Sequence, residues 1–124
     1  MNFQDLFAYQ KSVSLSMQIL EISTQFPKKE TYSLTDQIRR SSRSVSAAIA
    51  EAYRKRNYPR HFASKLADGD AENSETQVWL EYAYKCQYLA EGSYKKLMIE
   101  SEEVGKLINY MILNPKKFGV KTEE

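Results

Sequence analysis

Basic side chains gather in the middle of the chain, where their spacing could neutralise phosphate groups. Between Ser33 and Leu66 there are 8 Lys and Arg residues against 2 Asp and Glu, a net charge of +6, while the rest of the chain carries −4. In a helix, four of these arginines would fall within about 100° of one another, opposite a set of apolar residues. Arginine matches phosphate oxygens in bidentate geometry, so the pattern predicts a nucleic-acid-binding face.

The residues expected to form this face are Arg39, Arg40, Arg43, Arg54, Lys55, Arg56, Arg60 and Lys65. Tyr53 and Tyr58 are interleaved with them and could stack on unpaired bases. Two other interpretations stay open. The arginines could bridge to acids of a neighbouring subunit or partner protein, or they could form a solvated helix face partly neutralised by Asp36 and Glu51.

An acidic run follows the basic stretch and raises the question of a metal site. The run consists of Asp68, Asp70, Glu72 and Glu75. A di-iron bundle needs Glu-x-x-His pairs, and the single histidine, His61, does not follow a glutamate by three. A calcium loop needs a final Glu where Trp79 stands. We therefore predict no metal and no cofactor, and interpret the run as a surface face or as a complementary patch for the arginines.

The sequence contains no pattern typical of an active site. His61 has no placed partner for acid–base catalysis, and Cys86 is expected in mid-helix as a small buried hydrophobe. Gly-rich phosphate loops and nucleophile elbows are absent from the sequence. We predict that the protein is not an enzyme.

Composition and periodicity predict the scaffold that positions these residues. The chain has 124 residues, 42% of them hydrophobic, with only 4 Gly and 3 Pro, which is typical of long helices separated by short breaks. Apolar residues recur at helical spacing, and no alternating strand pattern occurs. We expect one all-α domain over residues 1–124, an antiparallel up-down four-helix bundle, with helices at about 5–26, 33–56, 59–90 and 93–113 and a tail over 114–124.

The predicted helix ends depend on a few capping residues. Asp5 is expected to begin the first helix, and Ser33 to cap the second, with Asp36 as a short capping box. Gly92 is expected to end the third helix and Ser93 to cap the fourth.

Aromatic residues late in the third helix predict a core or a subunit interface. They are Trp79, Tyr82, Tyr84 and Tyr88. Tyrosine buries a large ring and keeps a polar tip for a partner or water, which suits either role. No apolar run is long enough to cross a bilayer, the first residues do not resemble a signal peptide, and one cysteine cannot form an internal disulfide. We therefore expect a cytoplasmic protein that is not inserted in a membrane.

Several stretches of the chain resemble the bacterial four-helix-bundle family also called 23S ribosomal RNA intervening-sequence proteins, or S23-like proteins. These stretches are Phe26-Pro27 with Glu30, Tyr32 and Leu34; Gln37-Ile38-Arg39-Arg40 with Ser44-Val45 and Ile49-Ala50-Glu51; residues 74–80, SETQVWL; and residues 103–106, EVGK, with Asn114-Pro115. Together they span nearly the whole chain. Ala48 stands where the family usually has Asn and Ala52 where it usually has Gly, and both changes favour helix continuity.

The resemblance implies a homopentamer around a central channel. Some members are encoded inside insertions in ribosomal RNA genes, and a relative of the family binds nucleic acid, so the resemblance favours an association with nucleic acid. A related protein, the accessory variability determinant of diversity-generating retroelements, acts with a reverse transcriptase. We accordingly expect a non-catalytic oligomer that associates with RNA or DNA, or with a nucleic-acid enzyme, through the basic face. The alternative is a protein-interaction scaffold whose arginines form salt bridges between subunits or to a protein partner.

Overall fold

Four amphipathic helices make up most of residues 1–121, the part of the chain that the computed structural model describes. They are α1 (Phe7–Ile22), α2 (Leu34–Arg54), α3 (Pro59–Lys85) and α4 (Glu91–Leu113). Short 3-10 helices flank them: η1 (Phe3–Asp5), η2 (Ser23–Gln25), η3 (Lys28–Glu30) and η4 (Pro115–Phe118). No strand occurs within these residues, so the all-α prediction is confirmed. The last part of the predicted tail, residues 122–124, lies outside the described residues.

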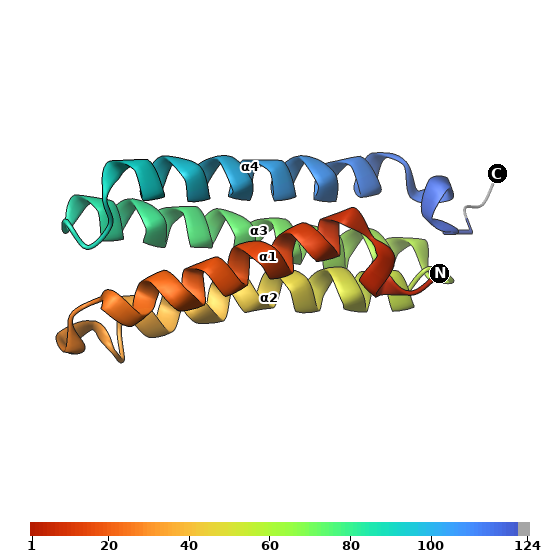
Figure 1. The fold of residues 1–124 in the computed structure, drawn as a ribbon. Coiled ribbons are helices and arrows are strands. Elements are labelled where there is room, and N and C mark those ends of the chain that lie inside the picture. Colours follow the sequence, from red (N-terminus) through yellow and green to blue (C-terminus); the bar gives the residue numbers. More distant parts are fainter. Residues whose placement is uncertain (122–124) are drawn as a thin grey trace.

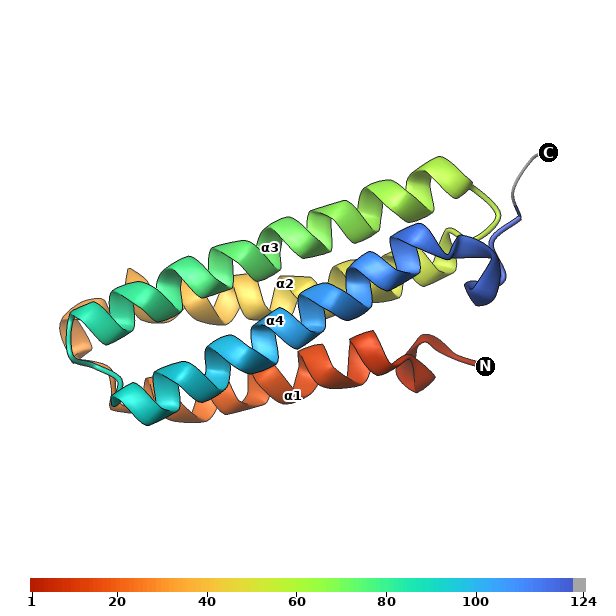
Figure 2. The same cartoon turned by 90° about the horizontal axis from the view of Figure 1, so that it is seen from above.

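Consecutive helices run antiparallel, and each packs against its neighbour in the chain, with α4 closing onto α1 (Figures 1 and 2). The α1–α2 and α3–α4 connections lie at one end of the bundle. The α2–α3 junction lies at the other end, together with the beginning of α1 and the end of α4. The up-down four-helix bundle is therefore the observed fold, and the pentamer stays a prediction.

The core is made from the apolar faces that the helical periodicity defines. Each helix contributes large side chains with less than 2% of their surface exposed: Ile19, Ile38, Ile49, Phe62, Leu66, Leu80, Val104, Ile108 and Met111. Full burial of such a side chain stabilises the fold by about 1.5–3 kcal/mol. The spacing of these residues along each helix leaves the opposite face to polar groups.

Small residues allow α2 and α3 to approach closely. A Cβ atom placed on Gly69 of α3 would lie 3.2 Å from the Cβ of Ala48 in α2. Both positions are buried. The alanine that departs from the family pattern thus packs against a glycine of the neighbouring helix.

Buried polar side chains fix the helices relative to one another. Asn73 of α3 donates from Nδ2 to the Ser101 carbonyl of α4 at 2.8 Å, and its Oδ1 accepts from the Ser101 hydroxyl, also at 2.8 Å. Gln77 donates to the same hydroxyl at 2.9 Å. Because an unpaired buried amide is costly, this network favours a single register between α3 and α4.

Two of the predicted N-terminal caps are wrong in detail. Asp5 lies in η1, where its carboxylate accepts the Asn2 backbone N–H at 2.9 Å, and α1 begins only at Phe7. Ser33 precedes α2 as expected, but its hydroxyl donates to Glu30 Oε1 at 2.6 Å and makes no bond to the helix backbone. The predicted capping box with Asp36 is not formed.

Glu30 takes the place of that capping box. Its Oε1 also accepts the Leu34 N–H at 3.3 Å, and its Oε2 accepts the Tyr88 hydroxyl at 2.9 Å. The hydrogen bond from the Ser33 hydroxyl, followed by the one from the Tyr88 hydroxyl, holds the pKa of the Glu30 carboxyl below its ordinary value. The same carboxylate raises the pKa of Tyr88 to about 12. Glu30 therefore joins the start of α2 to the α3–α4 connection.

The end of α3 differs from the prediction because the chain turns earlier than Gly92. Gln87 adopts a left-handed conformation with φ of 66°, its N–H bonds to the Tyr84 carbonyl, and the Tyr88 N–H bonds to the Ala83 carbonyl at 2.8 Å. This is the Schellman arrangement that closes a helix, here without glycine. Gly92 lies in the first turn of α4, as does Ser93, and neither forms the predicted cap.

Candidate nucleic-acid interface

The first three arginines of α2 have different surroundings. Arg39 is half-buried and donates from Nε to Ser23 Oγ at 2.8 Å, which ties it to the end of α1. Arg40 is exposed and lies 3.8 Å from the Asp36 carboxylate. Arg43 is exposed and forms no ion pair with a described residue. Of the three, only Arg43 is left with an uncommitted guanidinium.

A second group of basic residues gathers at the end of the bundle that holds the chain termini. Arg54 ends α2, Lys55 and Arg56 follow it, and Arg60 lies in the first turn of α3. The segment after α4 reaches the same end and adds lysines that sequence reasoning missed (Figures 1 and 2). We call the following residues the cationic end: Arg54, Lys55, Arg56, Arg60, Lys116, Lys117 and Lys121.

Arg56 joins the two parts of the cationic end. Its Nε donates to the Tyr53 carbonyl at 2.8 Å and its Nη1 reaches the Phe118 carbonyl at 3.5 Å. The Lys121 N–H bonds in turn to the Arg56 carbonyl at 3.4 Å. Gly119 has φ of 82° and packs against the Arg56 side chain, so the chain can turn back here toward the α2–α3 junction. The tail lysines are thereby held beside the junction.

Three cations at this end lie over aromatic rings, and no residue of the cationic end forms an ion pair with a described residue. Arg54 lies 5.9 Å from the Phe3 ring centroid and Arg56 lies 3.7 Å from that of Tyr53. Lys55 lies 6.0 Å from the Tyr58 ring centroid, and Lys117 Nζ bonds to the Tyr110 hydroxyl at 2.7 Å, at the edge of that ring. A ring orients a cation without cancelling its charge. Within residues 1–121, the charge of the cationic end is therefore not neutralised by ion pairs.

Arg60 has a position that folding alone does not favour. It is the second residue of α3, where the helix dipole attracts negative charge, and the first turn of α3 contains no acid. It is exposed, and none of the described carboxylates forms an ion pair with it. Lys55 and Lys116 instead follow the C-terminal ends of α2 and α4, where cations are favourable.

The two predicted stacking residues have different surroundings. Tyr53 is only 5% exposed and one face of its ring is covered by Arg56, so the structure does not present it to a base. Tyr58 is 59% exposed and its ring lies 5.8 Å from that of His61, tilted by 33°. Tyr110, which sequence reasoning missed, is 44% exposed at the same end, and its hydroxyl accepts a bond from Lys117 Nζ at 2.7 Å.

Part of the acidic run faces α2, as a complementary patch for the arginines would. Arg40 lines a hollow of ≈ 200 Å³ between α2 and α3 together with Glu72 and Glu75. Burial, followed by the hydrogen bond with Glu75, raises the pKa of Glu72, and Arg40 opposes this rise. Lys65, the last of the predicted basic residues, pairs with Glu51 at 3.2 Å. Asp68 and Asp70 are exposed.

The predicted aromatic group is neither a closed core nor a single patch. Trp79 is half-buried and donates to Glu75 at 3.3 Å, whereas Tyr82 beside it is 56% exposed. Tyr84 stacks on Tyr94 at 4.5 Å, and Tyr88 is bonded to Glu30 as described above. A hollow of ≈ 380 Å³ borders this region. Its lining includes Tyr32, Trp79, Tyr82 and Cys86.

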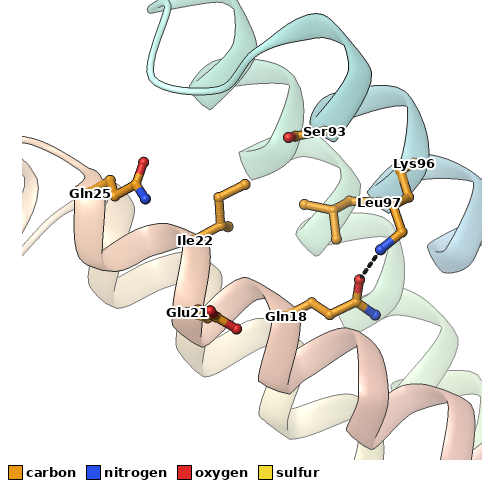
Figure 3. Close-up of a pocket in the computed structure, with 7 residues that line it drawn as sticks. All are labelled: Gln18, Glu21, Ile22, Gln25, Ser93, Lys96 and Leu97. Carbon is orange, nitrogen blue, oxygen red and sulfur yellow. Dashed lines mark hydrogen bonds between the residues drawn. The ribbon is translucent and has the colours of Figure 1, made fainter.

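Another hollow lies between α1 and α4, at the end opposite the cationic end (Figure 3). Its volume is ≈ 310 Å³, and it is lined by Gln18, Glu21, Ile22, Gln25, Ser93, Lys96 and Leu97. Lys96 donates to Gln18 Oε1 at 2.9 Å across the hollow. Gln18 donates in turn to Glu100 at 2.7 Å. Because these polar groups are bonded to one another, we interpret the hollow as a groove of helix packing.

The described residues do not assemble a metal site or a reactive pair from the remaining candidates. Within residues 1–121, no three His, Cys, Asp or Glu side chains come together as metal ligands. His61 is exposed beside Tyr58. Cys86 is exposed at the end of α3, which corrects the prediction of a buried mid-helix thiol, because the helix ends at Lys85. No described helix is long and apolar enough to cross a membrane.

Comparisons with known proteins agree with this architecture. A model of the family described as 23S rRNA-intervening sequence protein matches residues 4–110. The chain is also similar to a solved structure, a protein of unknown function from the S23 ribosomal protein family of Bacteroides thetaiotaomicron VPI-5482. The two share 26% identity over 85% of this chain and 94% of that chain, with a TM-score of 0.77. No match is found among curated proteins. The family match ends before Lys116, so the tail lysines lie beyond it.

Proposed function

The chain belongs to the 23S rRNA-intervening sequence protein family, and we propose that it is a non-catalytic protein that binds nucleic acid, RNA foremost, through its cationic end. Further, we propose that it assembles as a homopentamer. A symmetric ring repeats any local patch on each subunit, so the field of the cationic end would be multiplied although each chain carries only +2.

One observation carries the proposal: Arg54, Lys55 and Arg56 lie over aromatic rings, and no residue of the cationic end forms an ion pair with a described residue. Phosphate binding needs charge that is oriented but not neutralised, and cation–π contacts supply both conditions. The position of Arg60 at the start of α3 supports the same conclusion, because a purely structural residue there would be acidic or neutral.

The salt dependence of binding tests the proposal. Each phosphate contact lowers log K by about 0.7 per tenfold rise in salt for a single strand and about 0.9 for duplex DNA. Five or six contacts at the cationic end therefore predict a slope of about −4 for a single strand. We would measure fluorescence anisotropy of labelled structured RNA and of duplex DNA over a salt series. Affinity that does not change with salt would contradict the proposal.

A matched pair of variants localises the binding. Lys116→Glu/Lys117→Glu reverses two adjacent lysines of η4 at the cationic end, and Lys28→Glu/Lys29→Glu does the same in η3 at the opposite end. Both pairs are exposed and both change the net charge by the same amount. We expect the first variant to bind more weakly, with a salt-dependence slope that is shallower by about 1.4 for a single strand. The second variant should keep most of the wild-type affinity and slope. Equal losses would mean that net charge, not position, governs binding.

A second candidate function is a protein-interaction scaffold. The observation that favours it is the exposed aromatic pair Tyr32 and Tyr82 beside Trp79, since tyrosine and tryptophan are enriched at interfaces. This alternative predicts that Arg40→Glu/Arg43→Glu shifts the native mass to smaller species and that the wild type binds no nucleic acid. Native mass spectrometry of the wild type also tests the pentamer.

A further inference from the structure

The aromatic residues among the cations indicate which form of nucleic acid the site would take. We infer that the cationic end binds an unpaired strand, with Tyr58 as a platform for a base and the surrounding basic side chains on the phosphates. This inference rests on the proposed function and adds to it the preference for single-stranded over duplex nucleic acid.

Tyr58 has the exposure and the neighbours that a stacking platform needs. It is 59% exposed, and the ring of His61 lies 5.8 Å away at a shallow 33° tilt. Lys55 Nζ is 6.0 Å from the centre of the Tyr58 ring, within reach of a phosphate next to a stacked base. A large ring left this exposed loses the free energy of burial, so its presence at the α2–α3 junction has no evident folding role.

A second aromatic site lies on the other side of the Arg56 link. Tyr110 is 44% exposed and Lys117 Nζ lies 5.2 Å from its ring centroid, while Phe118 meets it edge to face at 6.1 Å. Arg56 reaches the Phe118 carbonyl and lies two residues before Tyr58, so it joins the segments that carry the two sites. Exposed rings alternating with cations are the arrangement by which proteins follow single strands.

Duplex nucleic acid fits this arrangement less well. In a duplex the faces of the bases are stacked on each other, so an exposed tyrosine has no base face to contact. A free strand presents both bases and phosphates to the same surface. The rings at the cationic end therefore add affinity only for unpaired nucleotides, whereas the cations add affinity for either form.

The test compares single strands and duplexes of equal length. Labelled oligo(U) and oligo(dT) of about 12 nucleotides, and RNA and DNA duplexes of the same length, would be titrated with the full chain at one salt concentration. We expect tighter binding of the single strands. Tyr58→Ala should weaken single-strand binding about tenfold, change duplex binding little, and leave the salt slope unchanged, because no phosphate contact is removed.

Two further variants separate stacking from folding. Tyr58→Phe keeps the ring and should retain affinity, and Tyr32→Ala removes a tyrosine that is 94% exposed at the opposite end and should have no effect. Equal affinity for single strands and duplexes, with Tyr58→Ala unchanged, would overturn this inference and leave the proposed function standing. If the wild type binds none of the probes, the proposed function itself fails. Where both single strands bind more tightly than the duplexes, the inference is supported, and a difference between oligo(U) and oligo(dT) assigns the strand to RNA or DNA.

Discussion

Reversing the charge of Arg60 should make the protein more stable and a weaker binder. Arg60 is the second residue of α3, and its guanidinium opposes the positive end of the helix dipole. One charge at such a position contributes about 0.3–1 kcal/mol, so Arg60→Glu both removes an unfavourable interaction and adds a favourable one. Because the side chain is exposed, we expect the free energy of unfolding to rise by about 1 kcal/mol, near the low end of the combined range of the two effects. This corresponds to a rise in Tm of roughly 4 °C.

The same change should weaken binding of nucleic acid. Loss of one phosphate contact lowers the salt slope by about 0.7 for a single strand, and the introduced carboxylate repels the strand as well. Stability would be measured by urea unfolding at low ionic strength and one fixed protein concentration, since an oligomer's apparent stability depends on concentration. Binding would be measured by anisotropy with the oligonucleotides described above.

Two controls separate the dipole effect from a general effect of charge. Arg60→Gln removes the opposing charge without adding an acid and should give about half of the stability gain. Arg43→Glu lies in the middle of α2, where the dipole has little effect, and should give none of it. A fall in stability for Arg60→Glu would refute the reasoning, because it would mean that Arg60 makes a stabilising contact that the structure does not contain.

Three further substitutions test the fold. Glu30→Gln should lower Tm at pH 7, because the lowered pKa of Glu30 means that its ionised carboxylate stabilises the fold. The difference in Tm between the variant and the wild type should disappear as the pH falls below the ordinary carboxyl value of 4.5, where the carboxylate becomes protonated. Measuring Tm of both proteins across a pH series checks this. Gln87→Gly should raise the free energy of unfolding by about 1 kcal/mol in urea titrations, because glycine adopts the left-handed conformation without strain. Asn73→Ala should lower it by about 1–3 kcal/mol, because two buried hydrogen bonds to Ser101 are lost, and an unchanged urea midpoint would contradict this.

Periodicity was enough to predict the four helices because each has a continuous apolar face. It could not place the end of α3, where glycine at position 92 suggested a cap. The chain turns at Gln87 instead, held by the Tyr88 N–H bond and the Tyr88–Glu30 contact, and those depend on tertiary structure. The predicted Ser33 cap of α2 is wrong for a related reason. Glu30, which lies outside the helix, accepts the bond from the Ser33 hydroxyl and also accepts the Leu34 N–H.

Helical spacing alone could not distinguish the predicted arginines from one another. Arg39 and Arg40 are successive residues, so they point about 100° apart and reach different grooves. Arg39 bonds to Ser23 at the end of α1. Arg40 pairs with Asp36 and lines a hollow with the acids of α3. The pair with Asp36 follows from the i,i+4 spacing within α2, but the groups of α1 and α3 that line each groove depend on the neighbouring helix.

The tail lysines, by contrast, could have been assigned from topology. In an up-down bundle of four helices, the second connection lies at the same end as both chain termini, so the charges of residues 54–60 and 116–121 must be considered together (Figure 1). At the other end the α1–α2 connection contains Lys28, Lys29 and Glu30, and the helix ends beside the uncharged α3–α4 connection add Lys85 and Glu91, which gives a net charge of only +1. The predicted fold thus already implied one end with unbalanced positive charge. Charge counted by bundle end, rather than along a single helix, would have located the candidate interface.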